Sequence, residues 1–115
     1  MQQVVLDSAV VPSASGGLTK IKGASIYLIG IGGTGMSAVA RLLMETGCRV
    51  YGSDLQLSPV ILSLEEKGAR ITLRQDGSWL SPQTDLVVIS AAIEEDNPDL
   101  ATARRQGLRV VKYSQ

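Results

Sequence analysis

The chain has 115 residues, of which 44% are hydrophobic and only 3% are aromatic, and its eleven basic residues balance its eleven acidic ones. This length fits a single domain, and an aliphatic composition favours buried parallel strands covered by helices over an antiparallel sandwich. The lack of a basic excess argues against a nucleic-acid surface, and no apolar run approaches the roughly 20 residues of a membrane span.

The N-terminal residues and the cysteine count indicate a cytoplasmic protein. Residues 1–14 have neither the basic leader nor the long apolar stretch of a secretory signal. Cys48 is the single cysteine and the chain has no histidine, so we expect neither an internal disulfide nor a metal site.

Five strands are predicted after a tail or lead-in that covers residues 1–24. The tail contains the linker-like stretch 12–17, and an extra edge strand within it is the less favoured alternative. Short apolar or β-branched runs predict strands at residues 26–29, 49–52, 71–73, 86–89 and 108–111. Residues 76–83, around Trp79, are predicted to form a loop.

Three helices are predicted between these strands. The first has apolar residues at positions 36, 39, 40 and 43, which is the spacing of one helical face. The second and third each begin with a capping residue and a proline, at Ser58-Pro59 and Asn97-Pro98. A glycine ends each helix, at positions 47, 68 and 107.

The alternation of strands and helices predicts an α/β fold, a single Rossmann-like domain over residues 25–115. Strand-helix-strand units of this length require parallel pairing with right-handed crossovers. We therefore predict a doubly wound parallel five-stranded sheet in the order 3-2-1-4-5, numbered along the chain. Ligands of such sheets bind beyond the carboxyl ends of the strands, here between the first and fourth strands, where the order reverses.

A glycine-rich turn joins the first strand to the first helix. Residues 30–35 read Gly-Ile-Gly-Gly-Thr-Gly and fit the pattern G-x-G-x-x-G. The first glycine permits a tight turn, the second lets a phosphate approach the backbone, and the third lets helix and strand pack closely. The free amides at the helix start attract an anion, and the hydroxyls of Thr34 and Ser37 are further donors. The turn predicts a nucleotide diphosphate site, and the alternative is that the glycines serve close packing only.

Two further segments are expected at the same edge of the sheet. Asp54 follows the second strand, 19 residues after Gly35, at a spacing where an acid holds ribose hydroxyls in dinucleotide folds. Its alternative role is to accept hydrogen bonds from loop amides near Gln56. Residues 90–93, Ser-Ala-Ala-Ile, follow the fourth strand, and their small side chains leave room for a ligand. No Ser/His/Asp or Cys/His constellation is present, so no catalytic residue is predicted in this chain.

Three motifs together resemble the N-terminal domain of the Mur ligases. They are Ile-Gly-Ile-Gly-Gly-Thr-Gly-Met-Ser at 29–37, Gly-Ser-Asp-Leu at 52–55, and Ser-Ala-Ala-Ile at 90–93 followed by Asp-Asn-Pro at 96–98. The resemblance covers residues 26–111. Thr34 departs from the family, which often has isoleucine at this position, and this change should not block a phosphate.

The resemblance implies a part in peptidoglycan precursor synthesis in the bacterial cytoplasm. Mur ligases have three domains and use ATP and Mg2+ to join an amino acid to a UDP-linked muramyl carboxylate through an acyl phosphate. For this chain the resemblance implies UDP-N-acetylmuramate as the bound substrate and L-alanine as the second substrate of the full-length enzyme. A family member that recycles murein tripeptide uses the same sugar nucleotide and stays an open alternative.

The resemblance also implies what this chain lacks. It contains no G-x-x-x-x-G-K-[ST] phosphate loop, so we expect the central ATP-binding domain and the C-terminal domain to be missing. The chain alone should then be inactive and hold no cofactor of its own.

The resemblance assigns substrate-binding roles by motif. The glycine turn would hold the diphosphate and sugar, the second motif would lie at the uridine, and the third would line the opposite wall. The residues are Gly30, Gly32, Gly33, Thr34, Gly35, Met36, Ser37, Ser53, Asp54, Leu55, Ser90, Ala91, Ala92 and Ile93. The main alternative is a NAD(P)-binding module of a regulatory protein or dehydrogenase, and a third is a scaffold that has lost its ligand.

Overall fold

Five parallel strands form most of the sheet in the computed structural model, which describes residues 5–6 and 22–114. They are β2 (Ser25–Ile29), β3 (Arg49–Ser53), β4 (Arg70–Thr72), β5 (Leu86–Ser90) and β6 (Val110–Ser114). Their spatial order is β4-β3-β2-β5-β6, which is the predicted order 3-2-1-4-5. The predicted doubly wound α/β fold is therefore confirmed.

A sixth strand departs from the prediction that residues 1–24 form only a tail. Strand β1 (Val5–Leu6) pairs antiparallel with β6, with Leu6 opposite Tyr113. The pairing covers the edge of β6, whose backbone groups would otherwise lack strand partners on that side. The less favoured alternative of an extra edge strand is thus the correct one, and the linker-like stretch 12–17 lies outside the described residues.

The last strand begins later than predicted. The sequence places it at 108–111, but Leu108 N–H donates to Ala103 O at 3.0 Å and closes the preceding helix. β6 then runs to Ser114, and its alternation leaves Val111 and Tyr113 buried on the same face. An apolar run alone did not separate the helix-closing residue from the strand.

The three helices are α1 (Thr34–Glu45), α2 (Pro59–Glu66) and α3 (Pro98–Arg105). Helices α2 and α3 begin where their capping residues predict, and all three helices end just before the predicted glycines. Ser58 Oγ accepts from Ile61 N–H at 3.3 Å, and Asn97 Oδ1 accepts from the first-turn amides of α3. The glycines at 47, 68 and 107 all have positive φ angles, as expected after a helix end.

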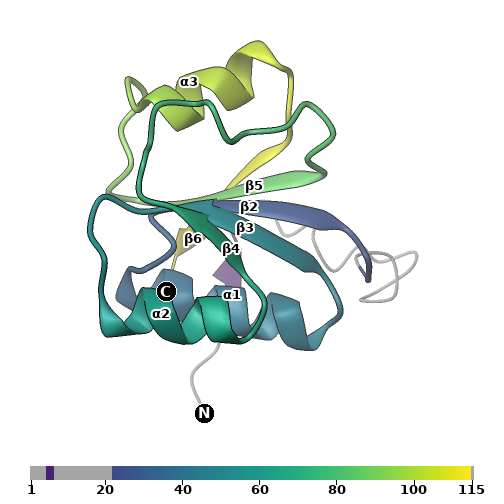
Figure 1. Cartoon of the computed structure of the whole chain (residues 1–115). Coiled ribbons are helices and arrows are strands. Elements are labelled where there is room, and N and C mark those ends of the chain that lie inside the picture. The colour runs from purple at the N-terminus through teal and green to yellow at the C-terminus, as the bar shows by residue number, and fades with distance from the viewer. Residues whose placement is uncertain (1–4, 7–21, 115) are drawn as a thin grey trace.

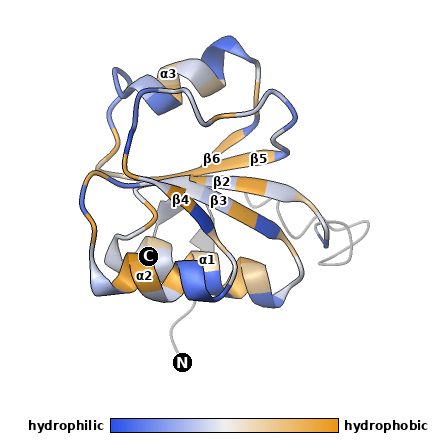
Figure 2. Cartoon of the chain, in the orientation of Figure 1, coloured by the Kyte–Doolittle hydropathy of each residue, from blue (hydrophilic) through white to orange (hydrophobic). Residues whose placement is uncertain are grey.

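The sheet is buried on both faces. Helices α1 and α2 cover one face, and α3 covers the other together with the connection between β4 and β5 (Figure 1). Along β2, Ile26 and Leu28 belong to the first core, whereas Tyr27 and Ile29 belong to the second. Strand β5 is hydrophobic along most of its length (Figure 2), as a strand covered on both faces must be. In the described part of the chain, every helix is too short or too polar to cross a membrane.

Candidate nucleotide-binding site

The glycine-rich turn is anchored to the carboxyl end of β3. Gly30 has a φ of +80°, and its N–H donates to Ser53 O at 2.8 Å. Ile31 N–H donates to the same carbonyl at 3.0 Å, and Gly33 N–H donates to Gly30 O at 3.0 Å. The chain therefore reverses tightly at the end of β2, as the first glycine predicts.

The first turn of α1 presents free amides at this edge. Gly33 is the N-cap and provides no side-chain acceptor. Among the described residues no acceptor is found for the N–H groups of Thr34, Gly35 and Met36. The first turn contains no acidic side chain of its own, so its own residues do not neutralise the partial positive charge of the helix start. Three donors and a helix dipole thus point at the space where an anion would sit.

Ser37 is placed differently from the other predicted donors. Its side chain is buried and its hydroxyl donates to Thr34 O at 3.0 Å. Because Ser37 lies on the core side of α1, its hydroxyl supports the first helical turn. Thr34 itself is exposed.

Asp54 lies against the second glycine of the turn. Its Oδ2 accepts from Gly32 N–H at 2.8 Å, and its Oδ1 accepts from Gln56 N–H at 3.2 Å. A Cβ added at Gly32 would lie 2.8 Å from Asp54 Oδ2 and 2.9 Å from Ile61 Cδ1. Gly32 is therefore required for close packing as well as for any phosphate approach. The loop-capping role of Asp54 is present in the structure, and its ribose role stays a prediction.

The third glycine packs on a residue that the sequence reasoning missed. A Cβ at Gly35 would lie 2.6 Å from Tyr113 Oη and 2.7 Å from Tyr113 Cζ. Tyr113 is only 9% exposed and comes from β6, beyond the strand predicted there. The expected close packing of helix and strand is confirmed, but its partner could be found only from the sheet order and the extended strand.

The residues after β5 form the facing wall. The register places both Ser53 and Ile89 beside Ile29, so the carboxyl ends of β3, β2 and β5 lie together. Ile93 Cδ1 lies 3.6 Å from where a Cβ on Gly30 would be. Ala91 and Ala92 are exposed, and Ser90 Oγ accepts from Ala92 N–H at 3.3 Å. The structure thus brings the first and third motifs together.

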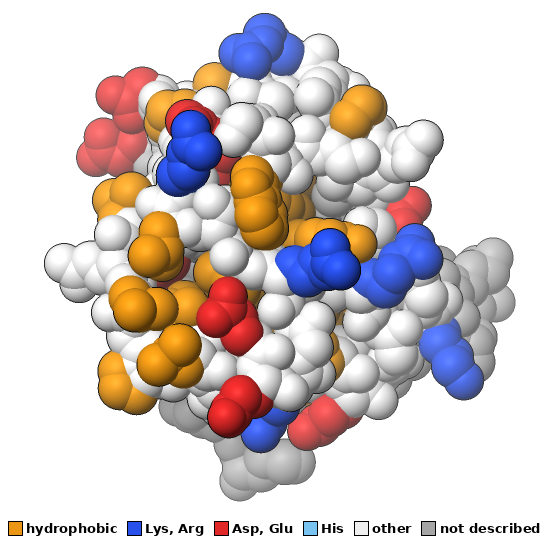
Figure 3. Space-filling view, viewed as in Figure 1, with side chains coloured by type: hydrophobic (Ala, Val, Ile, Leu, Met, Phe, Trp, Pro, Cys, Tyr) orange, Lys and Arg blue, Asp and Glu red, His pale blue; other side chains and the backbone are white. Residues whose placement is uncertain are grey.

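The connection from β3 to α2 adds an apolar surface next to Asp54. Leu55 is 71% exposed, and Leu57 and Leu62 are also exposed. Figure 3 shows hydrophobic side chains gathered on the side of the molecule toward which the strands point. Leu55 is therefore available to a flat apolar group.

Two hollows lie elsewhere, at the amino ends of the strands. One of about 510 Å³ is lined by Arg49, Lys67 and Arg70 among others, and one of about 340 Å³ by Tyr51 and Trp79 among others. Neither is lined by a predicted site residue. We favour the carboxyl edge, because the free helix amides and all three motifs lie there.

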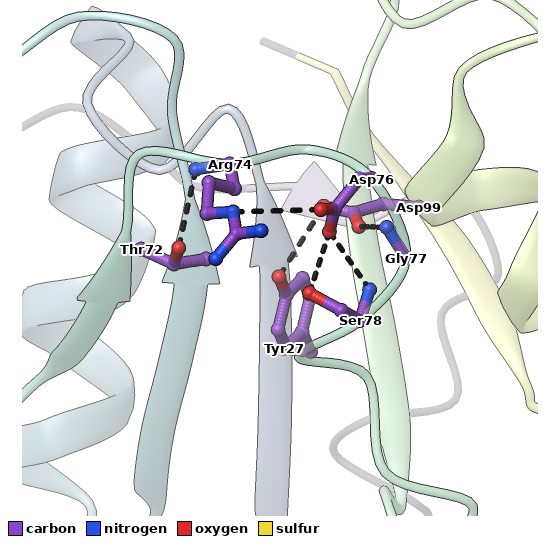
Figure 4. A network of polar contacts seen from close by, with 7 residues as sticks. All are labelled: Tyr27, Thr72, Arg74, Asp76, Gly77, Ser78 and Asp99. Carbon is purple, nitrogen blue, oxygen red and sulfur yellow. Dashed lines mark hydrogen bonds and ion pairs between the residues drawn. The ribbon is translucent and has the colours of Figure 1, made fainter.

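Asp99, in the first turn of α3, lies in a buried polar network beneath this edge, and it is not among the predicted site residues. It is fully buried, its Oδ2 accepts from Ser53 Oγ at 2.6 Å and from Tyr27 Oη at 3.2 Å, and its Oδ1 accepts from Gly77 N–H at 2.8 Å. Figure 4 shows the tyrosine, the carboxylate and Gly77 converging. Burial, followed by the charge of Asp99, raises the pKa of Tyr27 well above its usual value.

Comparison with known proteins shows the family of this chain. A family model described as "Mur ligase family, catalytic domain" matches residues 25–115. A UDP-N-acetylmuramate–L-alanine ligase from a Nocardioides species is 43% identical over 89 residues, which are 77% of this chain and 20% of that protein.

Solved structures agree with this result. A UDP-N-acetylmuramate-alanine ligase from Thermotoga maritima has a TM-score of 0.72 and 32% identity, covering 76% of this chain and 20% of its own. A murein peptide ligase from Psychrobacter arcticus has the same TM-score and identity, covering 76% of this chain and 18% of its own. The chain therefore spans about a fifth of the length of these proteins.

Proposed function

We propose, from the premise that this chain belongs to the Mur ligase family, that it is the N-terminal substrate-binding domain of a UDP-N-acetylmuramate–L-alanine ligase. The observation that carries the proposal is the set of three free amides at the start of α1. The turn after β5 lies close by, since Ile93 Cδ1 is 3.6 Å from where a Cβ on Gly30 would be. A diphosphate placed there accepts from Thr34, Gly35 and Met36 N–H groups. Each such bond to a charged group contributes about 1.5–3 kcal/mol.

The remaining contacts follow from the neighbours of this turn. Asp54 is half-buried beside Gly32, and its carboxylate oxygens retain lone pairs for ribose hydroxyls. The exposed Leu55 offers an apolar surface to the uracil ring. The small residues Ala91 and Ala92 leave space for the sugar on the opposite wall.

The chemistry belongs to the rest of the enzyme. The matching family model is described as a catalytic domain, but this sequence has no G-x-x-x-x-G-K-[ST] phosphate loop. Among the described residues no three His, Cys, Asp or Glu side chains cluster as metal ligands. Because the chain spans about a fifth of the length of its relatives, we assign ATP, Mg2+ and L-alanine to the parts of the full-length cytoplasmic enzyme outside this chain, and expect the chain alone to be inactive.

A second candidate is the ligase that recycles murein peptide. It is favoured by the murein peptide ligase from Psychrobacter arcticus, which matches this fold as well as the alanine ligase does. Both candidates bind the same sugar nucleotide at this site, so they differ in the acceptor that the absent domains recognise. The names of the relatives disfavour NAD(P) as the ligand.

Thermal melts of the 115-residue chain test the proposal. UDP-N-acetylmuramate at about 100 times its dissociation constant should add roughly 2.7 kcal/mol, a rise in Tm of roughly 10–20 °C. UDP should act in the same direction, whereas NAD and NADP should have no effect. A shift with NAD alone, or no shift with either uridine ligand at millimolar concentration, would refute the proposed site.

A matched pair of variants locates the site. Asp54→Asn should weaken UDP binding about tenfold, since it removes the charged acceptor that we assign to the ribose hydroxyls. Asp85→Asn is the control, because Asp85 Oδ2 also accepts from a backbone N–H at 2.8 Å but does so at Ser25, at the amino end of β2. Equal weakening by both variants would argue against a site at the carboxyl edge.

A further inference from the structure

We propose that Asp99 is a positioning residue for the glycine-rich turn and acts on it through Ser53. The inference rests on the proposed function, because a correctly placed turn matters for presenting the amides of α1 to a diphosphate. Asp99 itself is fully buried, so it does not contact the ligand.

A direct hydrogen bond links Asp99 to Ser53. Ser53 Oγ donates to Asp99 Oδ2 at 2.6 Å, a short bond typical of a charged acceptor, and both side chains are fully buried. The bond joins the last residue of β3 to the first turn of α3 across 46 residues of sequence. It therefore fixes the carboxyl end of β3 relative to α3.

The backbone carbonyl of Ser53 links this residue to the turn. Its carbonyl oxygen accepts from both Gly30 and Ile31 N–H groups, and the next residue, Asp54, accepts from Gly32 N–H. Three successive turn amides are thus bound by two successive residues at the end of β3. Any shift of Ser53 moves all three, and with them the first turn of α1.

Two other donors, Gly77 N–H and Tyr27 Oη, also bind Asp99. Gly77 N–H donates to Asp99 Oδ1 and ties the connection between β4 and β5 to it, and Tyr27 Oη donates to Asp99 Oδ2 (Figure 4). Ser53 Oγ donates to the same Oδ2. Among the described residues the ion pairs are Arg74–Asp76 and Arg104–Glu95, so no cation compensates Asp99. A buried carboxylate without a cation is costly, and its three donors and the start of α3 are what stabilise it. Because the carboxylate depends on these donors, the network holds Asp99 and its partners in a fixed position relative to one another.

The test compares two variants that each remove one hydroxyl from Asp99 Oδ2. Ser53→Ala removes the donor whose own backbone holds the turn, whereas Tyr27→Phe removes the donor that comes from β2 and leaves Ser53 in place. The readouts are the dissociation constant of UDP and the hydrogen-exchange rates of the Gly30 and Ile31 amides. The exchange rates are measured by NMR under conditions in which the variants have equal free energies of unfolding.

Ser53→Ala should raise the dissociation constant about fivefold and speed exchange of both turn amides, while Tyr27→Phe should leave both readouts unchanged. Asp99→Asn should act in the same direction as Ser53→Ala, and the double variant should not be additive. The inference is overturned if Ser53→Ala and Tyr27→Phe have equal effects, or if Asp99→Asn changes neither readout.

The two proposals can fail separately. If the unaltered chain binds no UDP, the proposed function fails, while exchange at Gly30 and Ile31 still supports or overturns the positioning role. If UDP binds but the exchange rates in Ser53→Ala match those in Tyr27→Phe, the positioning role fails and the proposed function stands.

Discussion

Replacing Gly35 with alanine tests whether the third glycine of the turn is required by its contact with Tyr113. An added Cβ would lie 2.6 Å from Tyr113 Oη and 2.7 Å from Cζ, closer than real Cβ contacts. The ring is largely buried and is part of the α1-side core, so it cannot move freely aside. The backbone of α1 or the ring of Tyr113 must therefore shift to make room for the added methyl group.

The expected magnitude comes from two opposing effects. Overpacking a well-packed core costs about 1–3 kcal/mol. Alanine in place of glycine within a helix recovers up to about 1 kcal/mol, since Gly35 lies inside α1. We expect a net loss of about 1–2 kcal/mol, which corresponds to a fall in Tm of roughly 5–15 °C for a domain of this size.

Urea unfolding of four variants measures this effect. Gly33→Ala is the control, because its added Cβ would meet nothing closer than 3.4 Å and its φ is −64°. In a Tyr113→Leu background, Gly35→Ala should become neutral or stabilising, because the clashing ring is absent. If Gly35→Ala is as stable as the unaltered chain, or the two substitutions are additive, the packing argument is wrong.

Three further predictions concern the folded chain. Burial and the charge of Asp99 raise the pKa of Tyr27, so ionisation of this group opposes the native state. The free energy of unfolding should therefore be unaffected by Tyr27 below about pH 10 and should fall above it. Tyr27→Phe should flatten that fall in urea titrations at pH 8 to 11, and parallel pH curves for the two chains would contradict the prediction. Asn97→Ala removes two cap bonds and should cost about 1 kcal/mol in urea unfolding, more than Ser58→Ala, which removes one longer bond; the reverse order would contradict the assignment. Burial raises the pKa of the Cys48 thiol, so iodoacetamide at pH 7 should label it far more slowly in the native chain than in urea, and equal rates would show that it is accessible.

Local sequence signals were sufficient for the three helices, for four of the strands and for the turn. The runs that form β2 and β5, the caps at Ser58 and Asn97, and the glycine after each helix all act within a few residues. Such signals follow from side-chain periodicity and from the unpaired amides of a helix start, so they can be read without knowing the fold.

The site was predictable in outline because parallel topology follows from the element order. Once β2, β3 and β5 are parallel, their carboxyl ends must meet at one edge, and the motifs that follow them meet there too. The sequence suggested loop amides near Gln56 as partners of Asp54, but it could not predict the bond to Gly32 N–H. Its contacts with Gly32 and Gln56 depend on how the turn and the next loop are packed.

Tertiary structure alone decided the partners that are distant in the chain. Asp99 reads in sequence as a helix-start acid, but Tyr27 and Ser53 reach it from strands 72 and 46 residues away. Tyr113 reaches Gly35 only because β6 lies beside β5, and residues 5–6 become a strand only because β6 has an edge to pair. The turn and its free amides are local properties of the sequence, whereas the residues that hold the turn in place depend on contacts that form only when the chain has folded.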